Sequence, residues 1–314
     1  MTGKVLVTGG CGFIGSNLVR LLLDKEQQVV VFDNLSKGNR AYLDGLDVAI
    51  IVGDIRDPDA LGAAMADVDR VVHLAAFGSV VESVEDPQTN FDMNVLGTFN
   101  VLNQAVKHSI DKLVFSSTGG ALIGDATPPV NEQSLPKPIS PYGAGKLCCE
   151  AYCHAFSKSY GINTVCTRFA NVYGPYSDHK SGVINQFYKR ITHGEPLIIY
   201  GDGSSTRDYI HVSDLCDGIT RALLNPDVSN DVIHLASGRE TSLRQLAELM
   251  ISVSGRTDHP IEFRDKRTGE VDRNFARYDY ARQVLGFEPR YTLEQGLKEA
   301  WDWLARHDSS AVDV

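Results

Sequence analysis

The sequence predicts an α/β fold in which a doubly wound parallel sheet carries a smaller C-terminal lobe. The first observation behind this prediction is an apolar strand over residues 5–7 that runs straight into a glycine-rich turn and then into a helix. The second is the alternation of short β-branched runs with helical stretches, which is typical of a parallel sheet with helices on both faces. The third is size, because 314 residues with 43% hydrophobic content are enough for a large core and an appended lobe.

The expected elements follow one another along the chain. After the strand at 5–7, the expected strands are residues 29–33, 48–52, 70–74, 112–115, 164–166 and 232–235. Two of the helices between them are easy to place. Residues 89–108 repeat apolar side chains at three- and four-residue spacing, and a second helix begins at Pro141, a suitable first helical residue, and runs toward Tyr160.

The glycine-rich turn has the spacing of a pyrophosphate site. Gly10, Gly12 and Gly15 satisfy G-x-G-x-x-G, and Gly9, Gly12 and Gly15 also satisfy G-x-x-G-x-x-G. Glycines at these positions permit a tight turn and close approach of the backbone to phosphate oxygens, while the helix beginning near Phe13 turns its N–H groups toward the anion. The sequence therefore predicts a dinucleotide-binding domain of the Rossmann type.

An acid at the end of the second strand selects the dinucleotide. Asp33 lies 18 residues after Gly15, close to the spacing of a ribose-binding acid. Its carboxylate would accept hydrogen bonds from the ribose hydroxyls and repel a 2′-phosphate, so NAD is favoured over NADP.

The pattern of alternating strands and helices breaks after about residue 170, where loops rich in glycine and proline and shorter elements follow. We expect residues 1–170 to form the NAD-binding domain, with later strands returning to it around residues 205–240. Residues 171–314 are expected mainly to form a lobe that binds the substrate.

Composition excludes several classes of partner. A net charge of −10 speaks against nucleic acid and requires local cations for any anionic substrate. No run of 18 apolar residues and no charged-then-apolar leader is present, so we expect a soluble cytoplasmic protein without a membrane partner. The six cysteines form no C-x-x-C pair and are expected to be reduced. No metal site is expected, because His73, His179, His211 and His234 have no ligand spacing.

A tyrosine and a lysine at a helix start carry the first chemical signal. Tyr142 and Lys146 are four residues apart and share one helix face. An ammonium near a phenol is expected to lower the phenol's pKa from about 10 toward the working pH and so make it a proton acceptor. The preceding strand ends in Ser116-Ser117-Thr118, whose hydroxyls would lie at the carboxyl edge of the sheet, where α/β proteins bind ligands.

Taken together, these features are similar to those of the extended short-chain dehydrogenase/reductases, in particular the NAD-dependent nucleotide-sugar epimerase/dehydratase branch. The resemblance covers nearly the whole chain. It rests on residues 8–15, 33–35, 54–55, 73–76, 94–98, 116–118, 142–146, 168–175 and 207–212.

The resemblance implies a role for each matching residue. Tyr142 would be the base, Lys146 its electrostatic helper and a ligand of the nicotinamide ribose, and Thr118 a hydroxyl that shares the substrate proton. The adenine would border Asp54 and Ile55. The complete set of cofactor-binding residues implied is Gly9, Gly12, Phe13, Ile14, Gly15, Asp33, Asn34, Asp54, Ile55, Leu74, Ala75, Ala76, Ser116, Tyr142, Lys146 and Phe169.

The same resemblance implies how a nucleoside-diphosphate sugar is held. Asn171, Arg207 and Arg267 would bind the diphosphate, with Glu270 near the nucleotide and Thr118 at the sugar. Guanidinium groups match phosphate oxygens in charge and geometry, which meets the need for local cations. Helices 89–108 and 141–160 resemble those that pair in family dimers, so a homodimer is expected.

The segment after Thr118 favours one reaction. Family dehydratases have an Asp-Glu pair there and nucleotide-uronate decarboxylases a Glu, whereas residues 119–124 read Gly-Gly-Ala-Leu-Ile-Gly. Without a carboxylate at that place, epimerisation of a UDP-hexose at C4 through a keto intermediate is the expected reaction. A nucleotide-sugar dehydrogenase, reductase or dehydratase and a non-catalytic NAD sensor remain as alternatives.

Two departures from the family pattern concern the sugar. Ile123 stands where many relatives have a tyrosine, which predicts a more apolar sugar pocket. His179 and Lys180, in a polar loop over residues 176–181, are candidates to contact a sugar carboxylate or N-acetyl group, with a solvated loop as the alternative. Glucose, an N-acetylhexosamine and a hexuronate all remain compatible with the sequence.

Overall fold

A seven-stranded parallel sheet forms the centre of the computed structural model, which describes residues 3–266 and 272–308. The strand order is β3-β2-β1-β4-β5-β6-β11, and each neighbouring pair is parallel. This is the Rossmann order with one added strand, so the predicted fold class is confirmed. The strands are β1 (Lys4–Thr8), β2 (Gln28–Asp33), β3 (Ala49–Val52), β4 (Arg70–His73), β5 (Lys112–Thr118), β6 (Asn163–Phe169) and β11 (Asp231–Leu235).

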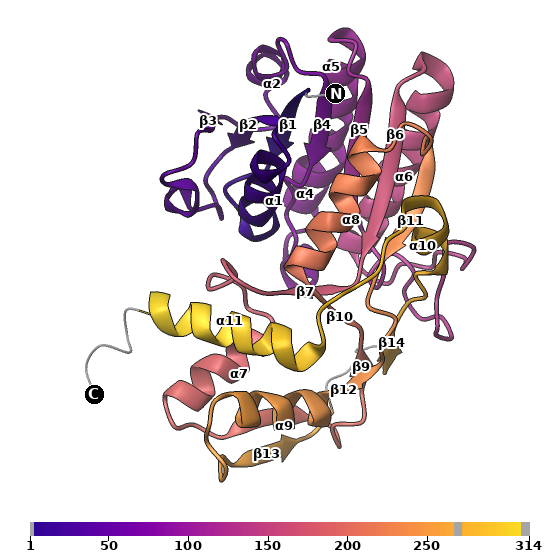
Figure 1. Ribbon diagram of the computed structural model, residues 1–314. Coiled ribbons are helices and arrows are strands. Elements are labelled where there is room, and N and C mark those ends of the chain that lie inside the picture. Colours follow the sequence, from indigo (N-terminus) through magenta and orange to yellow (C-terminus); the bar gives the residue numbers. More distant parts are fainter. Residues whose placement is uncertain (1–2, 267–271, 309–314) are drawn as a thin grey trace.

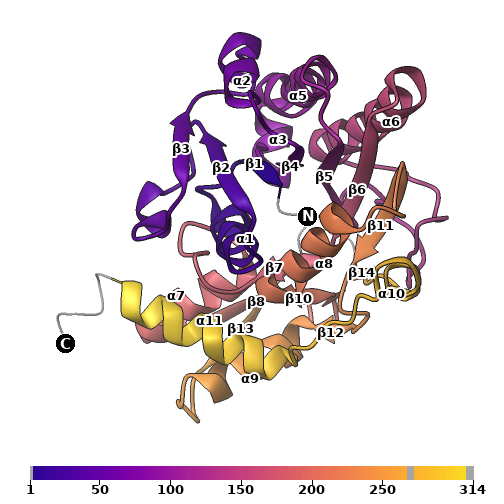
Figure 2. The same ribbon diagram turned by 45° about the horizontal axis from the view of Figure 1, so that its top comes forward.

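Helices cover both faces of this sheet, as Figure 2 shows. One face carries α1 (Phe13–Asp24), α8 (Val212–Leu224) and α10 (Asp279–Leu285), and the other carries α2 (Pro58–Ala64), α5 (Gly97–Lys107) and α6 (Pro141–Tyr160).

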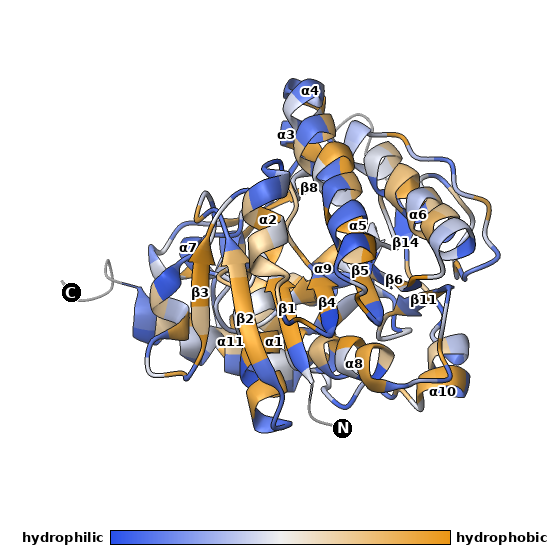
Figure 3. Ribbon diagram, turned by 90° about the horizontal axis from the view of Figure 1, so that it is seen from above, coloured by the Kyte–Doolittle hydropathy of each residue, from blue (hydrophilic) through white to orange (hydrophobic). Residues whose placement is uncertain are grey.

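Strand β1 shows why the sheet needs both layers of helices. Val5 and Val7 pack into the core under α1 and α8, while Leu6 packs into the core under α5 and α6. Successive side chains of a strand point to opposite faces, so a strand that is apolar at each of these positions is buried on both sides. Figure 3 shows β1 and β2 as largely apolar ribbons, in agreement with this burial.

The helix expected from Pro141 toward Tyr160 is confirmed as α6. Ser140 precedes it and its Oγ accepts the N–H of Gly143, a hydrogen bond that closes the first turn. The helix ends at Gly161, which has a φ of 77° and so adopts the left-handed conformation common after a helix.

The helix expected over residues 89–108 is present but is not one regular helix. It consists of α4 (Pro87–Asn90), a π-helical segment (Phe91–Leu96) and α5. The π-helical turn contains Asn94, whose side chain bonds the loop after β4 rather than the helix backbone. Apolar spacing predicts the helix but not this local widening, which is frequent at functional sites.

The later part of the chain adds a second group of elements, drawn below the large sheet in Figure 1. The hydrophobic core of this second group includes Ile191, Leu197, Leu246 and Leu297. Its strands are β7 (Asn171–Tyr173), β8 (Leu197–Tyr200), β9 (Thr206–Arg207), β10 (Tyr209–His211), β12 (Thr241–Ser242), β13 (Ile261–Arg264) and β14 (Arg273–Asn274), and its helices are α7 (Val183–Thr192), α9 (Leu243–Val253) and α11 (Leu293–His307).

Two short elements lie beside the carboxyl edge of the large sheet. A 3₁₀ helix (Arg40–Leu43) follows β2, and α3 (Val80–Glu85) follows β4. Across the described parts of the chain, no helix combines the length and the apolar character needed to cross a bilayer.

Candidate active site

The glycine turn after β1 fits a pyrophosphate. Gly9 has a φ of 71°, and a Cβ on it would lie 2.7 Å from the backbone nitrogen of Ala75. A Cβ on Gly15 would lie 2.6 Å from the Cα of Gly10. Gly12 is the N-cap of α1 and has no side chain with which to cover the first N–H groups of the helix. The turn is therefore packed too closely for larger residues, and it leaves helix N–H groups open to an anion.

Asp33 holds this turn from the end of β2. Its carboxylate accepts the N–H of Cys11 at 2.9 Å and the N–H of Leu35 at 2.8 Å. Burial raises the pKa of Asp33. Each oxygen keeps a further lone pair, so the carboxylate can accept ribose hydroxyls while it fixes the loop. The predicted ribose contact stays a prediction.

The pair of residues expected at the adenine is also ordered by local bonds. Asn34 donates to Asp54 at 3.0 Å, and Arg56 forms an ion pair with Asp54 at 2.9 Å. The hydrogen bond from Arg56 is the main reason that the pKa of Asp54 lies well below its usual range. Ile55 is buried in the core beneath α5.

The loop after β4 passes directly beneath the glycine turn. Leu74 donates its N–H to the carbonyl of Thr8 at 3.1 Å, and Ala75 donates to the Thr8 hydroxyl at 3.3 Å. Asn94 then fixes the next part of the loop, because its amide accepts the N–H of Phe77 at 2.7 Å and donates to the Phe77 carbonyl at 3.1 Å. Sequence reasoning used Asn94 only as part of a motif and missed this role. An asparagine within an apolar helical repeat was the available signal.

Tyr142 and Lys146 lie together on the first two turns of α6, beside the end of β5. The Lys146 ammonium donates to the carbonyl of Ser116 at 2.7 Å and lies 5.9 Å from the centroid of the Tyr142 ring. It also lies 4.6 Å above the Phe115 ring. Lys146 is buried, with 2% of its surface exposed. The two residues are thus held on one face, as the spacing predicts.

The pKa values in this pair differ from expectation. Burial raises the pKa of Tyr142 to about 12 and lowers the pKa of Lys146 to about 8. The expected lowering of the Tyr142 pKa is therefore wrong for the chain by itself, because burial disfavours the charged phenolate. Sequence spacing shows which groups are neighbours but not how deeply they are buried.

A buried charged network lies directly behind the pair. Ser117 donates to Glu150 at 2.5 Å, and Arg168 donates to the same carboxylate at 2.9 and 2.7 Å. All three side chains are buried. The network ties α6 to β5 and β6 next to Thr118, the partly buried last residue of β5. Sequence reasoning missed it, although Glu150 follows Lys146 by one helix turn on the same face.

Ile123, in the segment after Thr118, lies in the protein interior. This side chain is 1% exposed and packs in an interior cluster with Leu122 and Val130. The expectation that Ile123 makes the sugar pocket more apolar stays a prediction. A residue that sequence reasoning missed lies closer to the segment: a Cβ on Gly120 would be 2.8 Å from the amide nitrogen of Asn274, on β14.

The residues expected to bind substrate lie on the shorter strands. Asn171, on β7, donates to the carbonyl of Asp208 at 3.1 Å, and Arg207, on β9, donates to the carbonyl of Thr206 at 2.8 Å. Phe169, expected at the cofactor, is 9% exposed and packs in the core beneath α8. Arg267 and Glu270 lie outside the described residues.

The polar loop over residues 176–181 is attached to the segment after β2. The Tyr42 hydroxyl donates to Asp178, and Asp178 lies 3.9 Å from His179. Burial lowers the pKa of both His179 and Lys180. These contacts show a loop tied to the cofactor side of the molecule.

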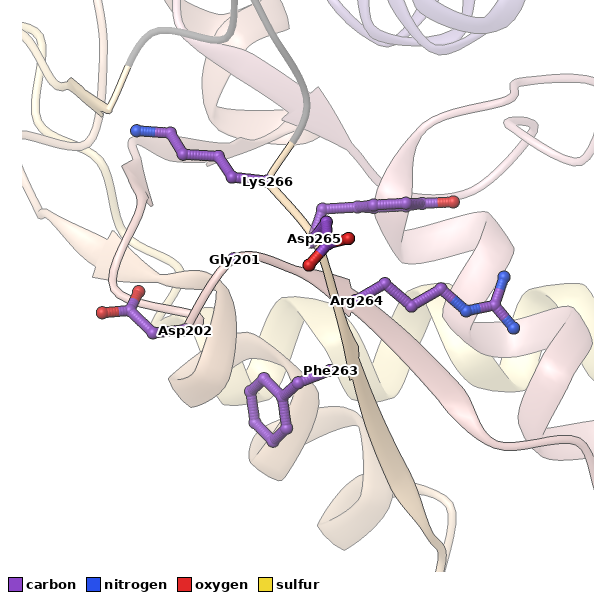
Figure 4. Close-up of a pocket in the computed structure, with 7 residues that line it drawn as sticks. Gly201, Asp202, Phe263, Arg264, Asp265 and Lys266 are labelled. Carbon is purple, nitrogen blue, oxygen red and sulfur yellow. The ribbon is translucent and has the colours of Figure 1, made fainter.

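Open hollows occur beside β9, where β8 and β13 end. One of about 430 Å³ is lined by Tyr200, Lys266, Arg273 and neighbouring residues. A second, of about 820 Å³, extends along β13, and Figure 4 shows Phe263 and Arg264 pointing to opposite sides of that strand. Neither Tyr142 nor Thr118 lines these hollows. The hollows therefore lie apart from the residues expected to carry out the reaction.

Known proteins resemble this chain over almost its whole length. A model of the NAD dependent epimerase/dehydratase family matches residues 5–236. A UDP-glucose 4-epimerase of Halalkalibacterium halodurans is 34% identical over 328 residues, which cover 96% of this chain and 96% of that protein.

Solved structures agree in fold. The UDP-glucose 4-epimerase of Thermotoga maritima, crystallised with UDP-glucose, is 35% identical with a TM-score of 0.92, and the match covers 97% of this chain and 99% of that one. A UDP-glucuronic acid 4-epimerase of Bacillus cereus, in complex with UDP-glucuronic acid and NAD, is 30% identical with a TM-score of 0.89, and the match covers 97% and 99%.

Proposed function

Because the chain belongs to the NAD dependent epimerase/dehydratase family, which acts on nucleotide sugars, we propose that it inverts C4 of a UDP-hexose through a transient 4-keto sugar. One observation carries the choice of reaction within the family. Tyr142 and Lys146 stand together at the end of β5, while the segment that follows Thr118 offers no carboxylate. Dehydration needs a further acid or base at that place, and epimerisation does not.

The proposed mechanism uses the residues at the end of β5. Tyr142 accepts the proton of the C4 hydroxyl and later returns it, and the Thr118 hydroxyl shares that proton. Burial raises the pKa of Tyr142 to about 12 with Lys146 already beside it, so Lys146 supplies only part of the positive charge that the phenol needs to act near neutral pH. The oxidised nicotinamide ring of bound NAD would supply the rest. The glycine turn, Asp33 and the loop after β4 would hold NAD, which would supply the hydride acceptor and donor for C4.

Cofactor and substrate are proposed to occupy opposite sides of the carboxyl edge. The glycine turn, Asp33 and the loop after β4 would hold NAD, so we propose residues 1–170 as the main cofactor domain. Residues 171–314 would mainly hold the nucleotide sugar, with Asn171, Arg207, Arg267 and Glu270 at its diphosphate and nucleotide. The hollow at Tyr200 borders β9 and supports a nucleotide at that end.

We further propose a homodimer in the cytoplasm. Large apolar side chains are exposed on the helices expected to pair: Phe91 and Leu96 on the segment before α5, and Tyr152 on α6. Burying such a surface against a second copy is the ordinary use of exposed apolar residues that lie together. Light scattering after size exclusion at micromolar concentration should give twice the chain mass, and a monomer would contradict the proposal.

The reaction is tested by a substrate panel. The purified protein is incubated with UDP-glucose, UDP-N-acetylglucosamine and UDP-glucuronate, and the products are identified by NMR. A C4 epimer formed without net NADH supports the proposal. Stoichiometric NADH would indicate a dehydrogenase, loss of water a dehydratase, and cofactor binding without any product a non-catalytic protein; each of these results would overturn it.

A further inference from the structure

The start of α6 is capped from two directions. The first N–H groups of a helix have no partner within the helix and need acceptors from elsewhere. Ser140, the N-cap residue, accepts the N–H of Gly143 at 3.2 Å. The N–H of Tyr142 is instead accepted by the Oγ of Ser83, at 3.2 Å, and Ser83 lies on α3, 59 residues earlier in the chain.

Ser83 is itself held firmly. Its side chain is completely buried, and its hydroxyl donates to the carbonyl of Val80 at 2.6 Å. With its proton directed to that carbonyl, the oxygen presents lone pairs to the Tyr142 N–H. The hydroxyl therefore has a fixed orientation as an acceptor.

Helix α3 carries few apolar anchors of its own. Val81 and Val84 are 68% and 62% exposed, so these positions do not pack into a core. Polar contacts hold the helix instead: Ser79 accepts the N–H of Glu82 at 3.1 Å, and Glu82 pairs with Lys37 at 3.3 Å across the edge of the sheet. The Ser83 hydrogen bond is thus a principal tie between α3 and α6.

We propose that Ser83 is a positioning residue for the reaction, which fixes the backbone of Tyr142 and thereby the direction of its phenol. The proposal rests on the proposed function, because it requires Tyr142 as the proton acceptor. The physical reason is local. Pro141 offers no N–H, and the Tyr142 N–H lies before the regular hydrogen bonds of the helix begin, so an acceptor outside α6 determines where the first turn sits. A displacement of about 1 Å in a reacting group can cost about 10²-fold in rate.

The first test is kinetic. Ser83→Ala should lower kcat by roughly 10-fold with KM within about twofold, since the lost contact matters for the reacting geometry and not for substrate binding. Ser140→Ala is the matched control, because it removes a cap from the same turn but leaves the Tyr142 N–H bonded. Its kcat should stay within about twofold of the parent, even where thermal stability falls.

A double-mutant cycle separates positioning from general stability. In a Tyr142→Phe background, adding Ser83→Ala should cause no further loss of kcat, because both changes act through one phenol. An additive loss, or a Ser83→Ala variant with parental kcat, would overturn the role of Ser83. If Tyr142→Phe keeps full turnover, the proposed function fails instead, so the two failures are distinguishable.

A second readout does not depend on turnover. Hydrogen–deuterium exchange of the peptide spanning residues 141–146 should become faster in Ser83→Ala, by roughly 10-fold at the start of α6, since the Tyr142 N–H loses its acceptor. Exchange at the parental rate would show that Ser83 does not restrain this turn and would overturn the proposal.

Discussion

The two sides of the candidate site are built differently. On the cofactor side, functional groups bond the backbone of separate elements: Asp33 holds Cys11, Asn94 holds Phe77, and Lys146 holds Ser116. On the substrate side, Asn171 bonds the Asp208 carbonyl, but the only side-chain hydrogen bond of Arg207 within the described residues goes to the adjacent Thr206 carbonyl. The proposed chemistry would therefore be fixed by the packing of the large sheet, whereas the proposed substrate recognition would depend on short segments that can change without disturbing that packing.

This difference agrees with what relatives bind. Epimerases of the same fold have been crystallised with UDP-glucose and with UDP-glucuronic acid. A constant catalytic side and a variable substrate side would produce such a range.

The largest effect is expected at the phenol. Tyr142→Phe removes the proton acceptor and keeps the ring packing, so turnover should fall by about 10²–10⁴-fold, the usual contribution of acid–base catalysis. Cofactor content, measured by absorbance after denaturation, should be nearly unchanged. Tyr152→Phe, on the exposed side of the same helix, serves as the control and should keep parental turnover.

The next largest effect is expected on the free energy of unfolding, through the buried ion pair that lies behind Tyr142 and Lys146. Arg168→Met leaves Glu150 buried without its cation, which should lower the free energy of unfolding by about 3–5 kcal/mol. The matched control is Arg273→Met, which breaks the exposed pair with Glu240 and should cost less than about 1 kcal/mol. Urea unfolding of both variants measures the contrast, and equal losses would contradict the structural difference between the two pairs.

A smaller effect is expected on the substrate side. Arg207→Ala should weaken binding of the UDP-sugar by about 10- to 100-fold, the range for losing hydrogen bonds to a charged group. The loss should appear in KM more than in kcat, because the diphosphate that Arg207 is proposed to hold is not the reacting group. Arg221→Ala, on α8, is the control. A fall in kcat at constant KM would place Arg207 in the chemistry and break the proposed separation.

The smallest effect, taken for one histidine and one pH unit, is a pH dependence of stability shared by both sides. Burial lowers the pKa of His234 to about 3 and of His211 to about 4, so both stay neutral in the folded protein while they gain protons in the unfolded chain below about pH 6.5. Stability should therefore fall with acidification by about 1.4 kcal/mol per pH unit for each histidine between pH 6 and 4. His234→Leu should remove one such contribution, and an unchanged slope in denaturation series at these pH values would contradict it.

Sequence predicted the elements whose signals are local. Each strand of the large sheet was expected because parallel strands read as β-branched runs, although the edge strand β3 is largely exposed and not buried on both faces. Pro141 predicted the start of α6, and the spacing of the glycines predicted the turn after β1.

The features that sequence did not predict depend on contacts between distant segments. The raised pKa of Tyr142 reflects burial, and the interior position of Ile123 reflects packing against Val130. The network of Ser117, Glu150 and Arg168 joins three elements whose approach is set by the whole sheet. Spacing along the chain identifies such residues as neighbours only within one helix or turn.

The order of the chain has a consequence for its synthesis. Helix α1 is covered by α8, whose Leu215 and Ile219 share its core, and the outer strand β11 pairs with β6. These covering elements begin only at residue 212, so residues 1–170, which are synthesised before them, would leave the apolar side of α1 and the edge of β6 uncovered. That nascent fragment should bind chaperones or aggregate until the last third of the polypeptide emerges, and a truncated chain expressed alone should scatter light strongly.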